Sequence, residues 1–125
     1  MENSKFEFQE LLNKEEFISV RPDTVLFRQG EAGDRMYIVL EGEISLEING
    51  QALGTEGVGG IVGEMALIDE TPRIGTATTL TDCVLAPLDM DAFTTLVKQK
   101  PEFSIHVMRV LTKRLRQAND FFNLF

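Results

Sequence analysis

Residues 57–76 read GVGGIVGEMALIDETPRIGT, and the interpretation of the whole chain starts from this stretch. Its glycines match neither the dinucleotide fingerprint nor the Walker loop, because no GK[ST] follows them and no βαβ unit surrounds them. Residues 64–68 are predicted to form a helical turn, and the glycine before them lets backbone approach a ligand closely. Exposed amides at a helix N-terminus favour an anion. Pro72 then ends the loop and delivers Arg73 into the following strand.

Arg73 is unusual because of its acidic surroundings. The chain has 12 basic and 20 acidic residues, a formal net charge of −8, and Arg73 is the only basic residue between Arg35 and Lys98. Such an arginine either forms a local ion pair or binds an anionic ligand. The candidate ion-pair partners are Glu64, Asp69 and Glu70. The negative net charge argues against nucleic-acid binding by this chain alone.

Short β-strands are predicted on both sides of this stretch. Residues 43–48 alternate strictly between polar and apolar, and Asn49 and Gly50 after them suit a two-residue hairpin turn. Further strands are predicted over residues 24–28, 36–40, 76–80 and 83–88. Pro87 indicates a sheet edge or a strand end. Many short strands without helices between them favour a sandwich or jelly-roll barrel.

Helical patterns flank the β segment at both ends. Ser4 and Glu7 have capping-box spacing, which predicts a short N-terminal helix. Asp91 is expected to cap a short helix, and Pro101 to open a longer one that reaches Phe122. The predicted organisation is one domain over 1–125, with an N-terminal helical segment at 1–22, a β-roll at 23–89 and C-terminal helices at 90–125.

Several classes of function are excluded or disfavoured by composition. Cys83 is the only cysteine, which excludes an intrachain disulfide framework and a thiolate zinc site. His106 is the only histidine, and no nucleophile–base–acid set is visible, so neither catalysis nor a bound metal is expected. The first residues do not resemble a signal peptide and no long apolar run occurs, so we expect a cytoplasmic protein without a membrane segment. The basic residues of the last helix are interpreted as a solvated face: Arg109, Lys113, Arg114 and Arg116.

The order G-E-M-A-L-x-x-x-x-P-R-x-x-T at residues 63–76 closely resembles the phosphate-binding cassette of cyclic-nucleotide-binding domains. Residues 26–31 and 33–39, followed by Gly42, resemble the opening strands and glycine turns of that family. Residues 100–116 resemble the terminal helix of its members related to the catabolite activator. The resemblance, which extends to protein-kinase-A regulatory subunits, implies a mainly β fold. That fold is an eight-stranded jelly-roll with an N-terminal helix and two C-terminal helices.

The resemblance implies a 3′,5′-cyclic nucleotide, cAMP or cGMP, as the ligand, with no further cofactor. Glu64 would accept a hydrogen bond from the ribose 2′-hydroxyl. Arg73 would neutralise the cyclic phosphate through paired, charge-assisted hydrogen bonds that lysine cannot reproduce. Asn119, on the last helix, would pair with an adenine edge, or Phe121 or Phe122 would stack on the base instead. The predicted ligand-binding residues are Val62, Gly63, Glu64, Met65, Ala66, Arg73, Ile74, Gly75, Thr76 and Asn119.

Three residues depart from the family pattern. Ile74 stands where the family often has serine, threonine or alanine, and it offers no hydroxyl to guanine, so cAMP is favoured over cGMP. Gly60 replaces a common aspartate, and Val62 replaces a common aromatic residue. These departures leave a second hypothesis open, in which the domain keeps the fold for protein interaction or dimerisation and has lost nucleotide binding.

The resemblance implies a regulatory module rather than an enzyme. Ligand binding would close the terminal helix over the roll, and the difference in affinity between the closed and open states would carry the signal. The partner that reads this signal is an effector domain or protein that the sequence does not identify. The apolar stretch at residues 121–125 would either cover the pocket or form a dimer contact, so a homodimer through the C-terminal helix is a further expectation.

Overall fold

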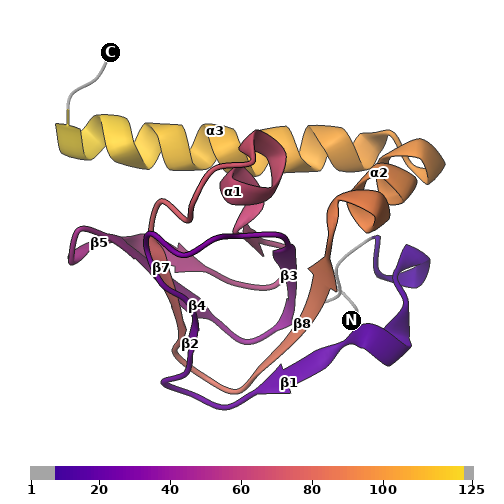
Figure 1. The fold of residues 1–125 in the computed structure, drawn as a ribbon, viewed down its shortest axis with the longest axis horizontal. Helices are drawn as coiled ribbons and strands as arrows, with labels where there is room; N and C mark the ends of the chain where they lie inside the picture. Colours follow the sequence, from indigo (N-terminus) through magenta and orange to yellow (C-terminus); the bar gives the residue numbers. More distant parts are fainter. Residues whose placement is uncertain (1–7, 123–125) are drawn as a thin grey trace.

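The computed structural model describes residues 8–122, without the side chains of residues 120–122. Within that range, eight strands form two four-stranded antiparallel sheets, in the orders β1-β8-β3-β6 and β2-β7-β4-β5 (Figure 1). The strands are β1 Ile18–Val20, β2 Val25–Phe27, β3 Met36–Glu41, β4 Ile44–Ile48, β5 Gln51–Glu56, β6 Ile61–Val62, β7 Thr76–Thr79 and β8 Cys83–Leu88. The predicted mainly β, eight-stranded fold is confirmed.

The predicted hairpin turn joins β4 to β5. Ile48 pairs with Gln51, and the two residues between them, Asn49 and Gly50, have φ values of 54° and 77°. Positive φ at both central positions matches the twist of the two strands, which is why this residue pair forms tight hairpins. Pro87 lies near the end of β8, beyond the part of that strand that pairs with β1, so its missing N–H interrupts no ladder on that side.

The core consists of two clusters that β3 separates. Met36, Ile38 and Leu40 point to one cluster, while Val39 points to the other, as the two-residue period of a strand requires. The first cluster lies under the helices and contains Phe103, and the second lies between the two sheets. Burying side chains of this size contributes roughly 1.5–3 kcal/mol each. Packing on both faces of β3 therefore ties the helices to the roll.

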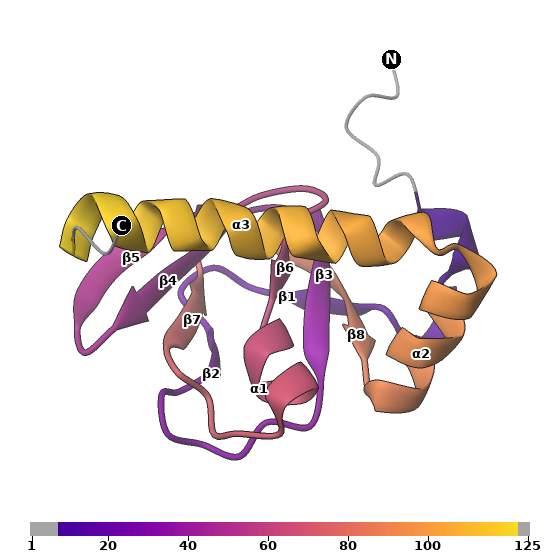
Figure 2. The same ribbon diagram turned by 90° about the horizontal axis from the view of Figure 1, so that it is seen from above.

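Three α-helices complete the fold: α1 Glu64–Asp69, α2 Met90–Gln99 and α3 Glu102–Phe122. Figure 1 shows α3 lying across one end of the roll, and Figure 2 shows it passing over strands of both sheets, with α2 at its N-terminal end. The cap of α2 is Asp89 and not the predicted Asp91, because Asp89 is the residue that leaves β8 in an extended conformation. Its Oδ1 accepts a 2.9 Å hydrogen bond from the Ala92 N–H. None of the described helices is long and apolar enough to cross a membrane.

The described part of the N-terminal segment, residues 8–22, contains less helix than the sequence predicts. The described part of residues 1–22 forms two 3-10 turns, Gln9–Leu11 and Lys14–Glu16, and then β1, which pairs with β8. Asn13 starts the second turn by accepting a hydrogen bond from the Glu15 N–H. Phe8 and Leu12 are buried, so the helical spacing of apolar residues reflects packing on the core rather than a continuous helix. The predicted capping box of Ser4 and Glu7 lies outside the described residues.

Candidate functional site

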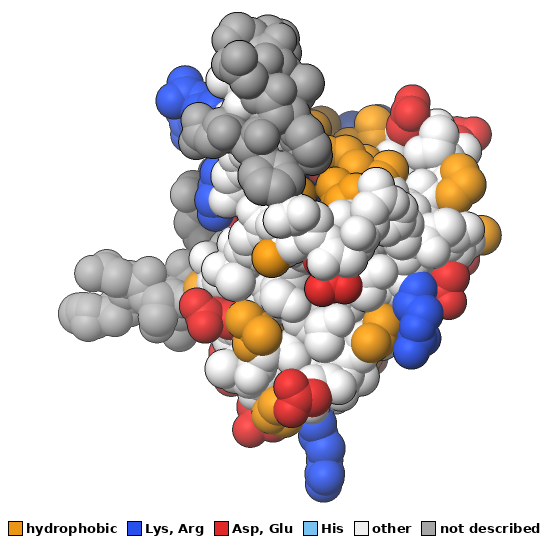
Figure 3. All heavy atoms as spheres, turned by 90° about the vertical axis from the view of Figure 1, so that its left-hand side faces the viewer, with side chains coloured by type: hydrophobic (Ala, Val, Ile, Leu, Met, Phe, Trp, Pro, Cys, Tyr) orange, Lys and Arg blue, Asp and Glu red, His pale blue; other side chains and the backbone are white. Residues whose placement is uncertain are grey.

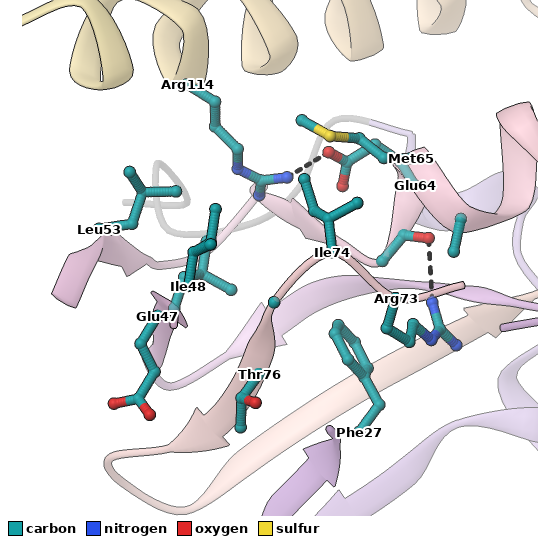
Figure 4. A pocket seen from close by; sticks show the side chains of 14 residues that line it. Phe27, Glu47, Ile48, Leu53, Glu64, Met65, Arg73, Ile74, Thr76 and Arg114 are labelled. Carbon is teal, nitrogen blue, oxygen red and sulfur yellow. Dashed lines mark hydrogen bonds and ion pairs between the residues drawn. The ribbon is translucent and has the colours of Figure 1, made fainter. Parts of the chain in front are cut away.

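A narrow hollow with a cavity volume of about 60 Å³ lies between the cassette and α3, and Figure 4 shows it from close by. Strand β4 contributes one wall, α1 and the loop before β7 contribute the other, and α3 covers it from above. This volume is smaller than the roughly 300–1,000 Å³ of small-molecule sites, so the lining must shift to admit a ligand of that size. The lining residues are Phe27, Leu46, Glu47, Ile48, Leu53, Gly63, Glu64, Met65, Ala66, Arg73, Ile74, Gly75, Thr76 and Arg114.

Arg73 lies at the base of this hollow and is 5% exposed. Its Nη1 donates a 3.1 Å hydrogen bond to the Gly63 carbonyl, and its guanidinium carbon lies 4.2 Å from the centre of the Phe27 ring. Its Nε is buried without a hydrogen-bond partner. Among the described residues Arg73 has no salt bridge, which contradicts the local ion-pair alternative. Burial lowers the pKa of Arg73, and nearby Tyr37 and Asp34 oppose that shift.

Two glycines leave room for this guanidinium. A Cβ added to Gly33 would lie 2.5 Å from Arg73 Nε, and one added to Gly63 would lie 2.5 Å from Nη1. Gly63 also has a φ of 82°, in the left-handed region that glycine adopts without strain, and it is the cap from which α1 begins. The glycine before the cassette helix therefore serves both the turn and the arginine.

Glu64, the first residue of α1, is fully buried. Its Oε2 accepts a hydrogen bond from Arg114 Nη1, while its Oε1 is buried without a hydrogen-bond partner. A buried carboxylate oxygen without a donor costs free energy. One oxygen of Glu64 is thus engaged by α3, and the other is left for a hydroxyl or amide.

Arg114 lines the hollow, although the sequence did not predict it there. The prediction of a solvated face is wrong for this side chain, which is 6% exposed, pairs with Glu64 and donates to the Ile61 carbonyl (Figure 4). One available signal could have placed it. Arg114 continues the apolar stripe of Phe103, Val107 and Val110 at helical spacing, so it lies on the face of α3 that packs on the roll.

Much of the remaining lining of the hollow is aliphatic, although Phe27, Glu47 and Thr76 also contribute to it. Leu46 and Ile48 come from β4, Leu53 comes from β5, and Ile74 lies at the mouth with 46% of its surface exposed. On the end of the molecule that carries β5, Figure 3 shows hydrophobic side chains gathered near the top of the view, with charged side chains scattered over the rest. A flat apolar ligand group would find van der Waals contact with these walls.

Eight of the ten predicted site residues line the hollow, and two do not. Val62 is fully buried in β6, where it pairs with Tyr37 and belongs to the core between the sheets. Asn119 lies on α3, partly buried and outside the lining of the hollow as the described residues form it. Thr76 lines the hollow and also fixes the loop after β2, since its Oγ1 accepts a 3.0 Å hydrogen bond from the Gln29 N–H.

A family model described as the cyclic nucleotide-binding domain matches residues 17–100. The chain belongs to the cyclic nucleotide-binding domain family, as the resemblance of its cassette predicted. The matched range contains all eight strands, α1 and α2, and ends just before α3.

Known relatives agree with this assignment. The chain is 33% identical over 100 residues to a CRP-like cAMP-activated global transcriptional regulator of Mycobacterium tuberculosis, a match that covers 76% of this chain and 45% of the regulator. It is 41% identical over 68 residues to a cAMP-dependent protein kinase regulatory subunit of Eremothecium gossypii, covering 54% of this chain and 15% of that subunit. The chain therefore spans less than half the length of these relatives.

A solved structure supports the fold as well. The catabolite activator protein of Thermus thermophilus superposes with a TM-score of 0.73 at 28% identity, covering 94% of this chain and 58% of that one. Because 94% of the chain is covered, the superposition extends beyond the range that the family model matches.

Proposed function

We propose that this domain binds a 3′,5′-cyclic nucleotide in the hollow under α3, with cAMP preferred to cGMP, and acts in the cytoplasm as a regulatory module without catalysis of its own. One observation carries the proposal. A buried donor, Arg73 Nε, and a buried acceptor, Glu64 Oε1, lack partners on the same hollow. A ligand with an anionic oxygen and a hydroxyl a few ångströms apart would satisfy both.

The roles of the cassette follow from this chemistry. Arg73 binds the cyclic phosphate, since a guanidinium gives charge-assisted hydrogen bonds to phosphate oxygens. Glu64 accepts the ribose 2′-hydroxyl through Oε1 and would repel a phosphate, which orients the ligand. The backbone of Gly63, Met65 and Ala66 lies beside the sugar and phosphate, with the cavity lining as support for this arrangement.

The purine is assigned to the aliphatic part of the hollow. Leu46, Ile48 and Leu53 offer one side and Ile74 the other. Ile74 brings no hydroxyl to hydrogen-bond a guanine amino group, which supports the preference for adenine. Asn119 would reach the adenine edge once α3 moves closer to the roll, and this role rests on the resemblance to the catabolite activator.

The signal is proposed to pass through α3. Arg114 on this helix already contacts Oε2 of Glu64, so a ribose hydroxyl that donates to Oε1 would weaken the attraction between Oε2 and Arg114. A ligand shifts the position of the helix to the extent that it binds the two positions with different affinity. An effector domain or protein that contacts α3 would read this change.

A second copy of this chain is the proposed partner of the outer face of α3. Ile105, Met108 and Leu115 are 43%, 52% and 48% exposed, and their spacing of three and then seven residues places them on one face of α3, as in the heptad repeat of a coiled-coil seam, with Thr112 at the seam position between the last two. The same stripe favours the second candidate function, a dimerisation module of this fold that binds no nucleotide.

Isothermal titration calorimetry with cAMP and with cGMP separates the two candidates. Micromolar or tighter binding of cAMP, and weaker binding of cGMP, supports the sensor. The dimerisation module is favoured if neither nucleotide gives a heat of binding or a thermal shift while the protein sediments as a dimer.

A further inference from the structure

Glu56, the last residue of β5, is a second carboxylate beside Arg114, and the predicted site does not contain it. It is 3% exposed, its Oε2 lies 3.3 Å from Arg114 Nη2, and its Oε1 lies 3.6 Å from Lys113 Nζ. Burying a carboxylate is costly unless cations compensate for it. Both compensating cations here belong to α3, so the helix and this carboxylate depend on each other.

Gly60 provides the space for the Glu56 carboxylate. A Cβ added to Gly60 would overlap Glu56 Oε1 and would lie 3.2 Å from Glu56 Cβ. Gly60 is not among the residues with a positive φ, so its backbone does not require glycine. The requirement is one of volume, because the Glu56 side chain fills most of the place of a side chain on residue 60 and the Gly57 carbonyl oxygen would lie 3.0 Å from its Cβ.

The guanidinium of Arg114 is therefore shared by three segments. Glu56 contacts it from β5, the Ile61 carbonyl from β6 and Glu64 from α1. Without Glu56, the buried guanidinium would meet Glu64 as its sole carboxylate and would gain by engaging both oxygens of Glu64, as arginine does in bidentate pairs. That arrangement would take Oε1, the oxygen assigned to the ribose.

We propose that Glu56 is a positioning residue that fixes Arg114, and with it α3, so that only one oxygen of Glu64 is occupied by the helix. Gly60 is its steric counterpart. The consequence for ligand affinity rests on the proposed function, whereas the effect on α3 does not.

Hydrogen–deuterium exchange of the ligand-free protein tests the effect on α3. Glu56→Gln keeps the shape of the side chain and removes its charge. The change removes the negative charge of a buried ion pair and leaves the buried Arg114 with less compensation, so the amides of residues 110–118 should exchange about tenfold faster or more. The amides of β3 and β8 should not change, which would show that the roll is intact. As a matched control, Lys113→Gln removes the exposed partner and should change the rates by no more than about threefold.

A rescue experiment tests the pairing of Glu56 with Gly60. Glu56→Ala alone should exchange as fast as Glu56→Gln. In Glu56→Ala with Gly60→Asp, the carboxylate starts from a Cβ that touches the former position of Glu56 Oε1. Exchange of residues 110–118 should return to within about threefold of the unmodified protein, as expected for coupled sites.

The outcomes distinguish this proposal from the proposed function. The positioning role is overturned if the α3 amides of Glu56→Gln exchange at the unmodified rate. It is also overturned if the α3 amides of the double variant exchange as fast as those of Glu56→Ala. Both conclusions hold even if the protein binds cAMP. Faster α3 exchange in a protein that binds no cAMP supports the positioning role and removes the proposed function. If cAMP binds, Glu56→Gln should weaken its affinity about fivefold or more while 2′-deoxy-cAMP is affected less, because the lost contact is at the ribose.

Discussion

Arg73 keeps one N–H buried and unpaired, although its other contacts, the Gly63 carbonyl and the Phe27 ring, are in place. A buried donor without an acceptor costs about 1–3 kcal/mol, and a charged group costs more. Proteins retain such groups where a ligand supplies the missing partner. The free energy lost by leaving this N–H unpaired in the free domain would therefore be recovered when an anion binds to it.

Replacing Arg73 should abolish tight binding of cAMP. Arg73→Ala is expected to weaken binding by about 2–5 kcal/mol, as for loss of one side of a buried charged pair. Arg73→Lys should also bind weakly, because an ammonium lacks the guanidinium fork. Calorimetry measures both. Arg35→Ala is the control, since Arg35 is half exposed and pairs with the exposed Asp34. A loss of only a few tenths of a kcal/mol in Arg73→Ala would contradict the assigned role.

Glu64 is better tested by changing the ligand than by changing the residue, because Glu64 also holds Arg114. 2′-Deoxy-cAMP lacks the hydroxyl assigned to Oε1 and should bind about tenfold more weakly than cAMP, the scale of one hydrogen bond to a charged acceptor. Competition against labelled cAMP gives the ratio. Equal affinities of the two nucleotides would show that the carboxylate does not contact the ribose.

For single residues, the sequence predicts a place in the site only where the neighbouring residues in the chain form a motif. Glu64 and Arg73 were found because the cassette surrounds them. Glu56 and Arg114 were not, since each lies in an ordinary charged context and their contact joins positions far apart in the chain. For Arg114 the signal was present, as it continues the buried stripe of α3, whereas nothing near Glu56 distinguishes it from an exposed acidic residue.

Among the elements of the fold, helix α3 carries apolar side chains on two faces. Phe103, Val107 and Val110 pack on the roll, and Ile105, Met108 and Leu115 lie on the outer face. A helix that packs on one side normally carries polar residues on the other. The apolar stripe on the outer face of α3 therefore favours contact with a second copy of the chain.

Charges introduced on this stripe should separate a dimer into monomers. Met108→Glu with Leu115→Glu places like charges at the seam, and both side chains are about half exposed, so folding of the roll should not suffer. Sedimentation velocity should show a dimer for the unmodified protein and a monomer for the variant, with the same circular dichroism. A monomer in both cases would exclude α3 as a dimer contact at the concentration used.

Elements differed in how well the sequence predicted them. The β4–β5 hairpin and β8 were predictable because alternation and turn chemistry are local. The conformation of residues 8–16 was not predicted correctly. Phe8 and Leu12 are spaced as in a helix because both are buried, yet the residues around them form 3-10 turns. Tertiary packing, and not propensity, decides the conformation of such a short segment.

For the whole molecule, ligand binding should raise the free energy of unfolding and therefore the Tm. A ligand at a hundred times its dissociation constant stabilises the folded state by about 2.7 kcal/mol. For a domain of this size, about 1 kcal/mol corresponds to about 4 °C, so Tm should rise by about 10 °C with saturating cAMP. cGMP at the same concentration should give a smaller rise. An equal rise with both nucleotides would contradict the selectivity assigned to Ile74, and no rise would contradict binding.

The anchoring of α3 by Arg114 also has a consequence for the order of folding. Its partners Glu64 and Ile61 lie 50 and 53 positions earlier in the chain, and with Glu56 they form one short segment around β6. Contacts of such long sequence separation close large loops and form late. We expect the roll to fold first and α3 to dock afterwards as a separate cooperative unit. Such a unit can detach and return in microseconds to milliseconds while the roll stays folded.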